Sequence, residues 1–453
     1  MNRKQKHLQG RRGEVFLELT RDVPPDQVIC TAVDVHKYYH RVMLVNGRQE
    51  VLVPSFNVDT FQSGYDQLCA VIDETIARTQ AKVLFIGMEP TGHYFENLAR
   101  HLLDRYPNVR LVNSYAVSKN RDQKMLRNQK DDDIDLCSIA DLILRNNCFP
   151  FQPLCQEYLR LQNWVRFHKA KVKARTALMN QIIGHLDRIF PGLVATQEDQ
   201  PKLFADFWTN QTAQHLIRLC PNPRLLASMH PQELIQMFHA HQCRMGMVTA
   251  CRIIDFAQRV LLPPADVIDA RLPLLTLDLT LMDILEQVIS QTQEQIASLL
   301  AKTPGQVLTQ IKGIGVLWAA SYIAGIGNPL CYEHAGQTFK RSGLISGRND
   351  SGVHQRKGAG RHVTKVGDPH LRAALMQITH SLCQWQPYFG NYKTRLESRG
   401  KHPGVAAVAT ARKVNGVLFA LMQTQSQFDP KDKRGQPVPP RKSVRNGKKQ
   451  QPT

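Results

Sequence analysis

The segment "QVICTAVDVHKYYHRVMLVNGRQEVLVPSF", residues 27–56, decides the fold of the N-terminal part of this chain. Its β-branched and apolar residues fall into three short runs, "QVICTAVDVHK", "HRVMLV" and "EVLVPSF", which short polar turns separate. Such runs are typical of strands, and short connections are typical of antiparallel neighbours. The segment therefore predicts three consecutive antiparallel strands.

The pattern then alternates between helices and strands. An amphipathic helix is predicted over 60–78, and "AKVLFIGME", residues 81–89, has the nearly continuous apolar character of a buried central strand. A helix over 94–105, a strand over 109–113 and a helix from about Asp131 to Asn146 follow. This β-β-β-α-β-α-β order predicts an RNase H-like (RuvC-like) α/β domain over residues 27–150.

The middle of the chain has helical periodicity. Between about 155 and 190 apolar residues recur every seven positions, although His168 and Arg175 interrupt one seam, and a second long helix fits 276–302 with one apolar side that includes Leu281. These helices predict a long antiparallel coiled-coil arm over 151–304, with a helical insert at about 193–272. Residues 305–425 form a last, helical domain in this interpretation. The Pro-, Gly-, Lys- and Arg-rich tail 426–453 is predicted to be disordered and able to touch phosphates.

The charge of the chain points to a polyanionic partner. Its 453 residues contain 58 Lys and Arg against 38 Asp and Glu, a formal net charge of +20, and nucleic acid is the commonest such partner. The ten cysteines show no C-x-x-C pair, which favours reduced thiols over a zinc knuckle or a disulfide scaffold. No signal peptide and no membrane-length apolar run are apparent, so we expect a cytoplasmic protein without a membrane partner.

Carboxylates from three distant segments are the candidate catalytic groups. Asp34 ends the first predicted strand, Glu89 ends the central strand, and "KDDDIDL", residues 130–136, supplies Asp132 and Asp135 on one face of a helix. Four such groups at one rim of a sheet could hold a pair of Mg²⁺ ions for phosphoryl transfer. The alternative is an acidic first turn that complements the helix dipole, and we favour it for Asp131 and Asp133.

The C-terminal part adds a glycine-rich, basic region. Gly313 and Gly315 form a G-I-G turn between two predicted helices, which resembles a helix-hairpin-helix element that grips a phosphate. The loop "SGLISGRNDSGVHQRKGAGRHVTKVGD", residues 342–368, contains Ser351 next to a glycine. Alternating glycine and basic residues allow a backbone to approach phosphates closely. The basic candidates for these contacts are Arg348, Arg356, Lys357, Arg361 and Lys365.

These motifs together resemble one protein family. "VDVHK", "MEPTGHY", "LRNQKDDDIDLCSIA", "IKGIG" and "SGLISGRNDSG" occur in the order found in the DEDD transposases of bridge-RNA-guided insertion sequences. Those enzymes pair a RuvC-like domain with a C-terminal transposase domain. The resemblance covers about residues 27–150 and 305–400, and it identifies 305–425 with the transposase domain.

The resemblance implies a mechanism and a set of partners. It maps the acidic tetrad to Asp34, Glu89, Asp132 and Asp135 with Mg²⁺, and it implies that Ser351 attacks a DNA phosphodiester to form a covalent phosphoserine. Ser342 and Ser346 remain alternatives for the nucleophile. The implied partners are donor and target DNA, a structured non-coding guide RNA, and further copies of the chain in a dimer or tetramer that shares its active sites. The implied setting is the nucleoid of a bacterial cytoplasm.

Three other function classes compete with this interpretation. A metal-dependent RNase H-like nuclease or Holliday-junction resolvase would use the same carboxylates with water as the nucleophile. A sugar-kinase or actin-like ATPase would need glycine-rich phosphate loops after the early strands, and none is visible in the first 150 residues. An RNA-binding scaffold would explain the charge and the tail but not the acidic tetrad.

Overall fold

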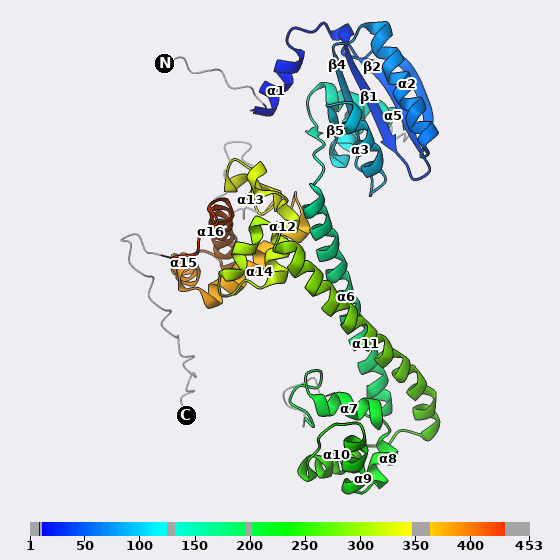
Figure 1. Cartoon of the computed structure of the whole chain (residues 1–453), viewed down its shortest axis with the longest axis vertical. Helices are drawn as coiled ribbons and strands as arrows, with labels where there is room; N and C mark the ends of the chain where they lie inside the picture. The colour runs from blue at the N-terminus through cyan, green and yellow to red at the C-terminus, as the bar shows by residue number, and fades with distance from the viewer. Residues whose placement is uncertain (1–8, 10, 125–131, 195–201, 347–362, 431–453) are drawn as a thin grey trace. The chain divides into compact units, whose positions relative to one another are not determined.

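The computed structural model describes residues 9, 11–124, 132–194, 202–346 and 363–430 of the chain (Figure 1). It divides into two compact units, Met1–Pro153 and Leu154–Thr453. The predicted disordered tail lies almost entirely outside the described residues.

The first unit contains a mixed sheet of six strands in the order β3-β2-β1-β4-β5-β6. β1 pairs antiparallel with β2 and parallel with β4, β2 pairs antiparallel with β3, β4 pairs parallel with β5, and β5 pairs antiparallel with β6. The strands are β1 (Val28–Val35), β2 (Tyr39–Asn46), β3 (Val51–Asp59), β4 (Val83–Met88), β5 (Val109–Leu111) and β6 (Phe149–Pro150). Along the chain, the elements from β1 to β5 follow the β-β-β-α-β-α-β order that the sequence pattern predicted for an RNase H-like domain.

Helices cover both faces of this sheet because the residues of its central strands are apolar on both sides. Ile29 and Val33 of β1 pack with α2 (Gln62–Thr79) and α3 (Phe95–Arg105) on one face. Cys30 of β1 packs on the other face with α5. The helices of this second face are α1 (Arg11–Thr20), α4 (Ser114–Lys124) and α5 (Asp132–Leu144). The sequence analysis did not anticipate α1, α4 or the two-residue β6; the Phe16 ring of α1 stacks on Phe85 at 5.2 Å between centroids.

One glycine sets how closely α5 approaches the sheet. Gly87 is buried in β4, and a Cβ at this position would overlap the side chain of Ile143 in α5. The bare backbone therefore lets α5 lie against the central strands. This contact matters for function because α5 carries Asp132 and Asp135.

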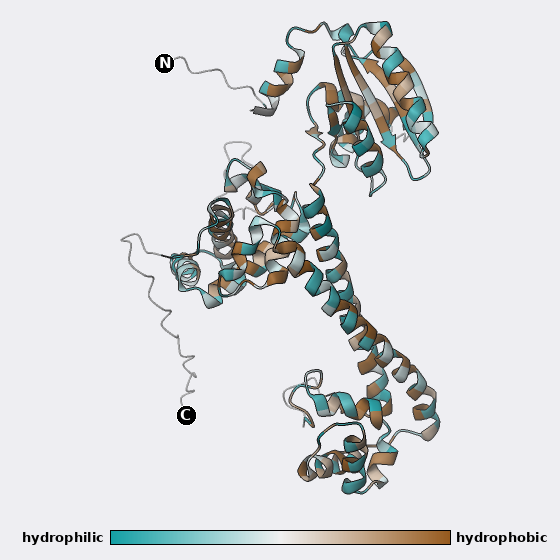
Figure 2. Ribbon diagram, in the orientation of Figure 1, coloured by the Kyte–Doolittle hydropathy of each residue, from teal (hydrophilic) through white to brown (hydrophobic). Residues whose placement is uncertain are grey.

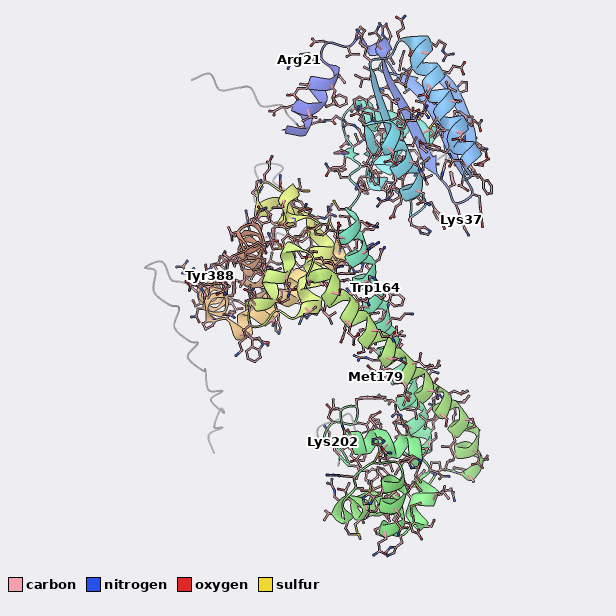
Figure 3. The ribbon with its side chains drawn as sticks, viewed as in Figure 1. Arg21, Lys37, Trp164, Met179, Lys202 and Tyr388 are labelled. Atoms are coloured by element: carbon pink, nitrogen blue, oxygen red, sulfur yellow. The ribbon has the colours of Figure 1, made fainter. Side chains whose placement is uncertain are left out.

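Two long helices, α6 (Gln156–Ile189) and α11 (Ala265–Leu300), pack along each other in the second unit (Figure 1). Their polar contacts run in opposite directions along the two helices: His168 Nδ1 lies 2.8 Å from Thr292 Oγ1, and Arg175 pairs with Glu286 at 3.2 Å. The pair is thus antiparallel. The two residues that interrupt the predicted apolar seam are the ones that make these cross-helix contacts. The labels on Trp164 and Met179 in Figure 3 mark two positions along α6. Supercoiling of the pair remains a prediction.

The second long helix differs from its prediction in two ways. It begins at Ala265 rather than near 276 and continues through Pro273, because Ile268 and Leu275 on either side of the proline are buried in the adjoining core. Its buried side is also rotated relative to the predicted one. Leu281 is 53% exposed, whereas its neighbour Met282 is buried.

The segment between these helices folds as a small helical subdomain at the far end of the pair. Its helices are α7 (Gln211–Leu219), α8 (Pro223–Ser228), α9 (Pro231–Ala240) and α10 (Met247–Arg259). Leu216, Phe238 and Ile253 of these helices share one core with Ile182 and Leu186 of α6.

The remaining helices surround the opposite end of α6 and α11. They are α12 (Val316–Ile326), α13 (Ala335–Arg341), α14 (Pro369–Trp385), α15 (Pro387–Ser398) and α16 (Pro403–Thr424), with 3-10 turns η2 (Pro304–Gln310) and η3 (Pro329–Cys331). Tyr158 of α6 and Leu300 of α11 belong to the same core, so this end of the helical pair is part of the C-terminal fold. The helices of this fold mix hydrophobic and hydrophilic residues (Figure 2), and α16 alone among the helices of the described residues is long and apolar enough to cross a membrane. Half of its most apolar stretch is buried inside the protein, as in a core helix.

Candidate active site

Asp34, His36 and Asp132 converge at the carboxyl end of β1. His36 Nε2 lies 3.0 Å from Asp34 Oδ2 and 3.9 Å from Asp132 Oδ2, and one ligand atom from each residue lies within 4.8 Å of the others. Asp34 is the second-last residue of β1, and Asp132 is the first residue of α5. The structure therefore brings together carboxylates that are almost a hundred residues apart in sequence.

The local folding of each segment explains this convergence. Side chains alternate across a strand, so Asp34 shares the face of Cys30 and Ala32, the face that α5 covers. Asp34 is only 9% exposed. Burial raises the pKa of its carboxyl above the ordinary value; His36 opposes this rise, and the charges of Asp132 and Asp135 add to it. Removing a carboxylate from water while other carboxylates face it is unfavourable unless a cation compensates the charge.

Asp133 pairs with an arginine outside the acidic cluster. Arg41 of β2 donates a hydrogen bond from Nε to Asp133 Oδ1 at 2.7 Å. This hydrogen bond, with one from Ser55, lowers the pKa of Asp133 below its ordinary value. The prediction that Asp133 is a structural residue of the first helical turn agrees with this contact, although its partner is an arginine on the sheet and not the helix dipole alone. Asp131 lies outside the described residues.

Asp135 faces the same region and is held by an arginine. Arg121 Nη1 of α4 lies 2.7 Å from Asp135 Oδ1, and both side chains are largely buried. The guanidinium therefore supplies a positive charge beside the cluster. Asp135 is not one of the three residues whose ligand atoms converge.

Glu89 follows β4 directly. The parallel register of β1 and β4 ends at the Val33–Met88 pair, so Glu89 follows the last paired residue of β4 at the same end of the sheet as Asp34. Its side chain is partly exposed, and it too lies outside the group of three convergent ligands. The structure thus brings together two members of the predicted tetrad, Asp34 and Asp132, and leaves Glu89 and Asp135 outside the convergent group.

The residues present fit a divalent metal ion. Carboxylate oxygens are the ligands that hard cations such as Mg²⁺ prefer, and Asp34 and Asp132 supply them. An imidazole nitrogen is a poorer ligand for Mg²⁺, and the 3.0 Å contact to Asp34 suits His36 to orienting that carboxylate. His36 was not among the site residues predicted from the sequence. The signal was present in "VDVHK", where a histidine stands two positions after the strand-end Asp34.

The predicted nucleophile and most of its basic neighbours fall outside the described residues; these are Ser351, Arg348, Arg356, Lys357 and Arg361. The two alternative serines are described. Ser342 is fully buried, and its hydroxyl donates to the Phe339 carbonyl at 2.6 Å, which argues against a nucleophilic role. Ser346 is exposed and bridges to Val363 at the edge of the undescribed loop. Lys365 is exposed, with a positive φ of 54°.

The glycine turn is present, but its surroundings differ from the prediction. Gly313 has a φ of 108°, a value that favours glycine, and Gly315 precedes the first residue of α12. The element before the turn is the 3-10 helix η2 and not an α-helix, because its residues close i→i+3 turns such as Gln306–Thr303. Binding of a phosphate by Gly313 and Gly315 remains a prediction.

Comparison with known proteins gives the same family from both halves of the chain. Residues 31–191 match a DEDD family model described as a transposase, of the IS110 type, and residues 305–394 match the transposase IS116/IS110/IS902 family. Together the two matches cover more than half of the sequence. The chain belongs to the IS110 family of DEDD transposases.

A curated relative agrees with this assignment. The chain is 24% identical over 270 residues to the insertion element IS110 uncharacterized 43.6 kDa protein of Streptomyces coelicolor. The aligned residues make up 58% of this chain and 63% of the relative. The alignment therefore spans less than two thirds of that protein. Asp34 and Asp132 both lie within the segment that matches the DEDD model of the IS110 family.

Proposed function

We propose that this protein is the transposase of an insertion sequence and that it cleaves and rejoins DNA strands. The observation that carries the proposal is the convergence of Asp34, His36 and Asp132 at the carboxyl end of β1 in a chain of the IS110 family. The strongly basic composition suits a nucleic-acid substrate.

In this proposal Asp34 and Asp132 hold Mg²⁺, with Glu89 and Asp135 as further ligands of a two-ion site. The ions supply charge neutralisation at the transferring phosphoryl group. His36 holds the Asp34 carboxylate in position through its 3.0 Å hydrogen bond. Arg121 pairs with Oδ1 of Asp135 at 2.7 Å, which leaves Oδ2 as the oxygen that Asp135 would offer to a metal ion.

Ser351 is the proposed nucleophile. Attack by its hydroxyl on a phosphodiester forms a serine–phosphate bond and releases a 3′-hydroxyl, and attack by a 3′-hydroxyl of the exchanged strand restores a phosphodiester and the serine. Bond energy is conserved in this sequence, so rejoining needs no nucleotide cofactor. Oligomerisation, sharing of the active site between copies of the chain, and guidance by a structured non-coding RNA complete the proposal.

The test is to trap the covalent adduct with labelled DNA that carries the ends of the insertion sequence. Ser351→Ala should abolish the adduct and retain DNA binding, while Ser346→Ala, its exposed neighbour, should retain both. An adduct that persists in Ser351→Ala would overturn the assignment of the nucleophile. Strand cleavage that persists without any adduct would instead identify a nuclease that uses water.

A further inference from the structure

A second candidate site lies next to the acidic cluster, on the face of the sheet that α2 and α3 cover. It is a cavity of about 460 Å³ bounded by the end of β1, by β2, by the start of α2 and by α3. His36 lines this cavity and also belongs to the acidic cluster. His36 is therefore the residue that links the cavity to the acidic cluster at this end of the sheet.

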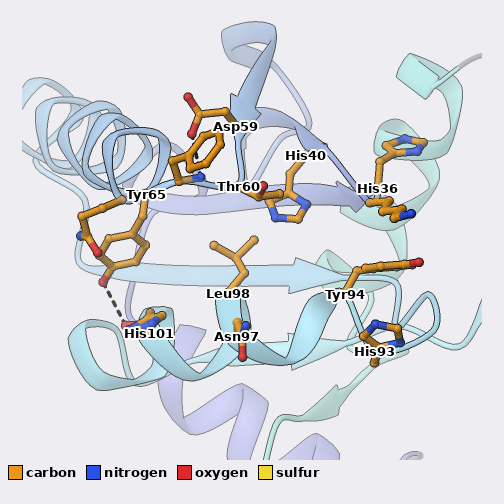
Figure 4. A pocket seen from close by; sticks show the side chains of 13 residues that line it. His36, His40, Asp59, Thr60, Tyr65, His93, Tyr94, Asn97, Leu98 and His101 are labelled. Atoms are coloured by element: carbon orange, nitrogen blue, oxygen red, sulfur yellow. Dashed lines mark hydrogen bonds between the residues drawn. The ribbon is translucent and has the colours of Figure 1, made fainter.

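The lining is rich in flat and polar side chains. Figure 4 shows His40, Tyr65, His93, Tyr94 and Asn97 around the cavity. The His93 and Tyr94 rings are 4.4 Å apart between centroids, and Tyr65 donates a hydrogen bond to the His101 carbonyl at 3.0 Å. Among the described residues, the cavity histidines other than His36 do not join a group of possible metal ligands. Flat rings and amide groups are what proteins use to stack and hydrogen-bond nucleobases.

His40 supplies an independent observation. It is 4% exposed, and its Nδ1 has no hydrogen-bond partner. A buried ring nitrogen without a partner is unfavourable, and His40 is one of the side chains that line the cavity. The edge of a nucleobase carries both donors and acceptors and can hydrogen-bond an imidazole ring in either tautomer.

We propose that this cavity holds one unstacked nucleobase of a DNA strand whose phosphate lies at the acidic cluster. The proposal rests on the proposed function, because it places the base beside the phosphodiester that is to be cleaved. A volume of about 460 Å³ falls within the range of small-ligand sites. Enzymes that do chemistry on a base take its nucleotide out of the stack in this way.

The experiment is photo-crosslinking of the full chain to a single-stranded oligodeoxynucleotide that contains 5-iododeoxyuridine, in Ca²⁺, with the modified peptides identified by mass spectrometry. Crosslinks should map to the segments that contain Tyr65 and Tyr94. Asn97→Trp fills the cavity from an exposed position and should weaken binding by roughly five- to a hundredfold, the worth of one base–aromatic stack. His40→Leu should act in the same direction. His239→Leu, at an exposed histidine of α9, is the matched control and should have no effect.

The outcomes separate this proposal from the proposed function. Crosslinks that map elsewhere, or that Asn97→Trp leaves unchanged, would overturn the base site even if the protein still cleaves DNA. An oligoribonucleotide that crosslinks to the same segments at least as efficiently would overturn the assignment to DNA. Crosslinks at the cavity in a protein whose Asp34→Asn variant still cleaves DNA would support the base site and contradict the proposed metal centre.

Discussion

The ring of His36 and the carboxylate of Asp34 lie 3.0 Å apart at the end of one strand. His36 follows Val35, the last residue of β1, and its ring reaches back to the Asp34 carboxylate. The first turn of α5 adds Asp132 to this pair. A single strand end and a single helix start are thus enough to build the centre of the candidate active site.

Neighbouring aspartates in α5 should differ sharply in metal binding. Asp132→Asn removes a carboxylate of the cluster and should lower Mn²⁺ affinity at least about tenfold, because a charged ligand is lost. Asp133→Asn is the matched control, since Asp133 is held by Arg41 at 2.7 Å and is not in the cluster. Electron paramagnetic resonance of added Mn²⁺ measures both affinities. Equal losses in the two variants would contradict the assignment of Asp132 as a ligand.

Removing Arg121 should strengthen metal binding. Arg121 pairs with Asp135 at 2.7 Å, and Arg121→Gln frees that carboxylate while it removes one positive charge from the region. At an effective dielectric constant of about 20, a unit charge roughly 10 Å away changes the binding free energy of a divalent cation by about 3 kcal/mol before salt screening, so we expect a gain in affinity of at least roughly tenfold. The control is Arg145→Gln, which breaks the ion pair between Arg145 and Asp141 of α5. Titration calorimetry with Mn²⁺ gives affinity and stoichiometry; an unchanged affinity in Arg121→Gln would contradict the expectation that Arg121 opposes metal binding.

Gly87 should link the packing of α5 to the metal centre. Gly87→Ala introduces a Cβ that overlaps Ile143, and such overpacking costs about 1–3 kcal/mol of the free energy of unfolding. Displacement of α5 should also lower Mn²⁺ affinity, because Asp132 moves with the helix. The double variant Gly87→Ala/Ile143→Ala should be less destabilised than the sum of the two single changes, as measured by urea unfolding. Strict additivity would show that the two residues do not interact.

The stability of the second unit should fall as the solution becomes acidic, partly through His168. Burial, followed by the charge of Arg175, lowers the pKa of His168 below its ordinary value of 6.5. The unfolded chain therefore binds a proton more readily than the folded chain. The free energy of unfolding should accordingly decrease as the pH falls through 6.5 towards the lower pKa of the folded state.

His168→Leu tests this expectation. Thr292 donates its hydroxyl proton to the Ile289 carbonyl at 2.7 Å, so His168 donates from Nδ1, and the leucine variant leaves the threonine satisfied. Chemical unfolding at pH 7.5 and 5.5 should show a smaller loss of stability in the variant than in the unmodified protein. The remaining slope would come from other groups, including His370, whose pKa is also lowered by burial. Equal slopes would contradict the role of His168.

Sequence patterns predicted most of the first unit because its elements are locally encoded. The alternation in 27–56 specified three strands, and the run 81–89 specified a buried strand between two helices. The patterns failed where tertiary contacts override local signals. Pro273 would normally end a helix, yet α11 continues through it because apolar residues on both sides are buried.

The sequence by itself determined which residues could do chemistry: a strand-end Asp34, the acidic turn that begins α5, and a basic chain that suits nucleic acid. Only the tertiary structure decided their partners. It brought Asp132 close to Asp34 and His36, and it paired Asp133 with Arg41, which lies 92 residues away in the sequence. It also paired Asp135 with Arg121 and buried Nδ1 of His40 without a hydrogen-bond partner. The physical reason is that secondary structure follows from periodicity within a few residues, whereas an ion pair depends on which distant side chains the packed core brings within a few ångströms.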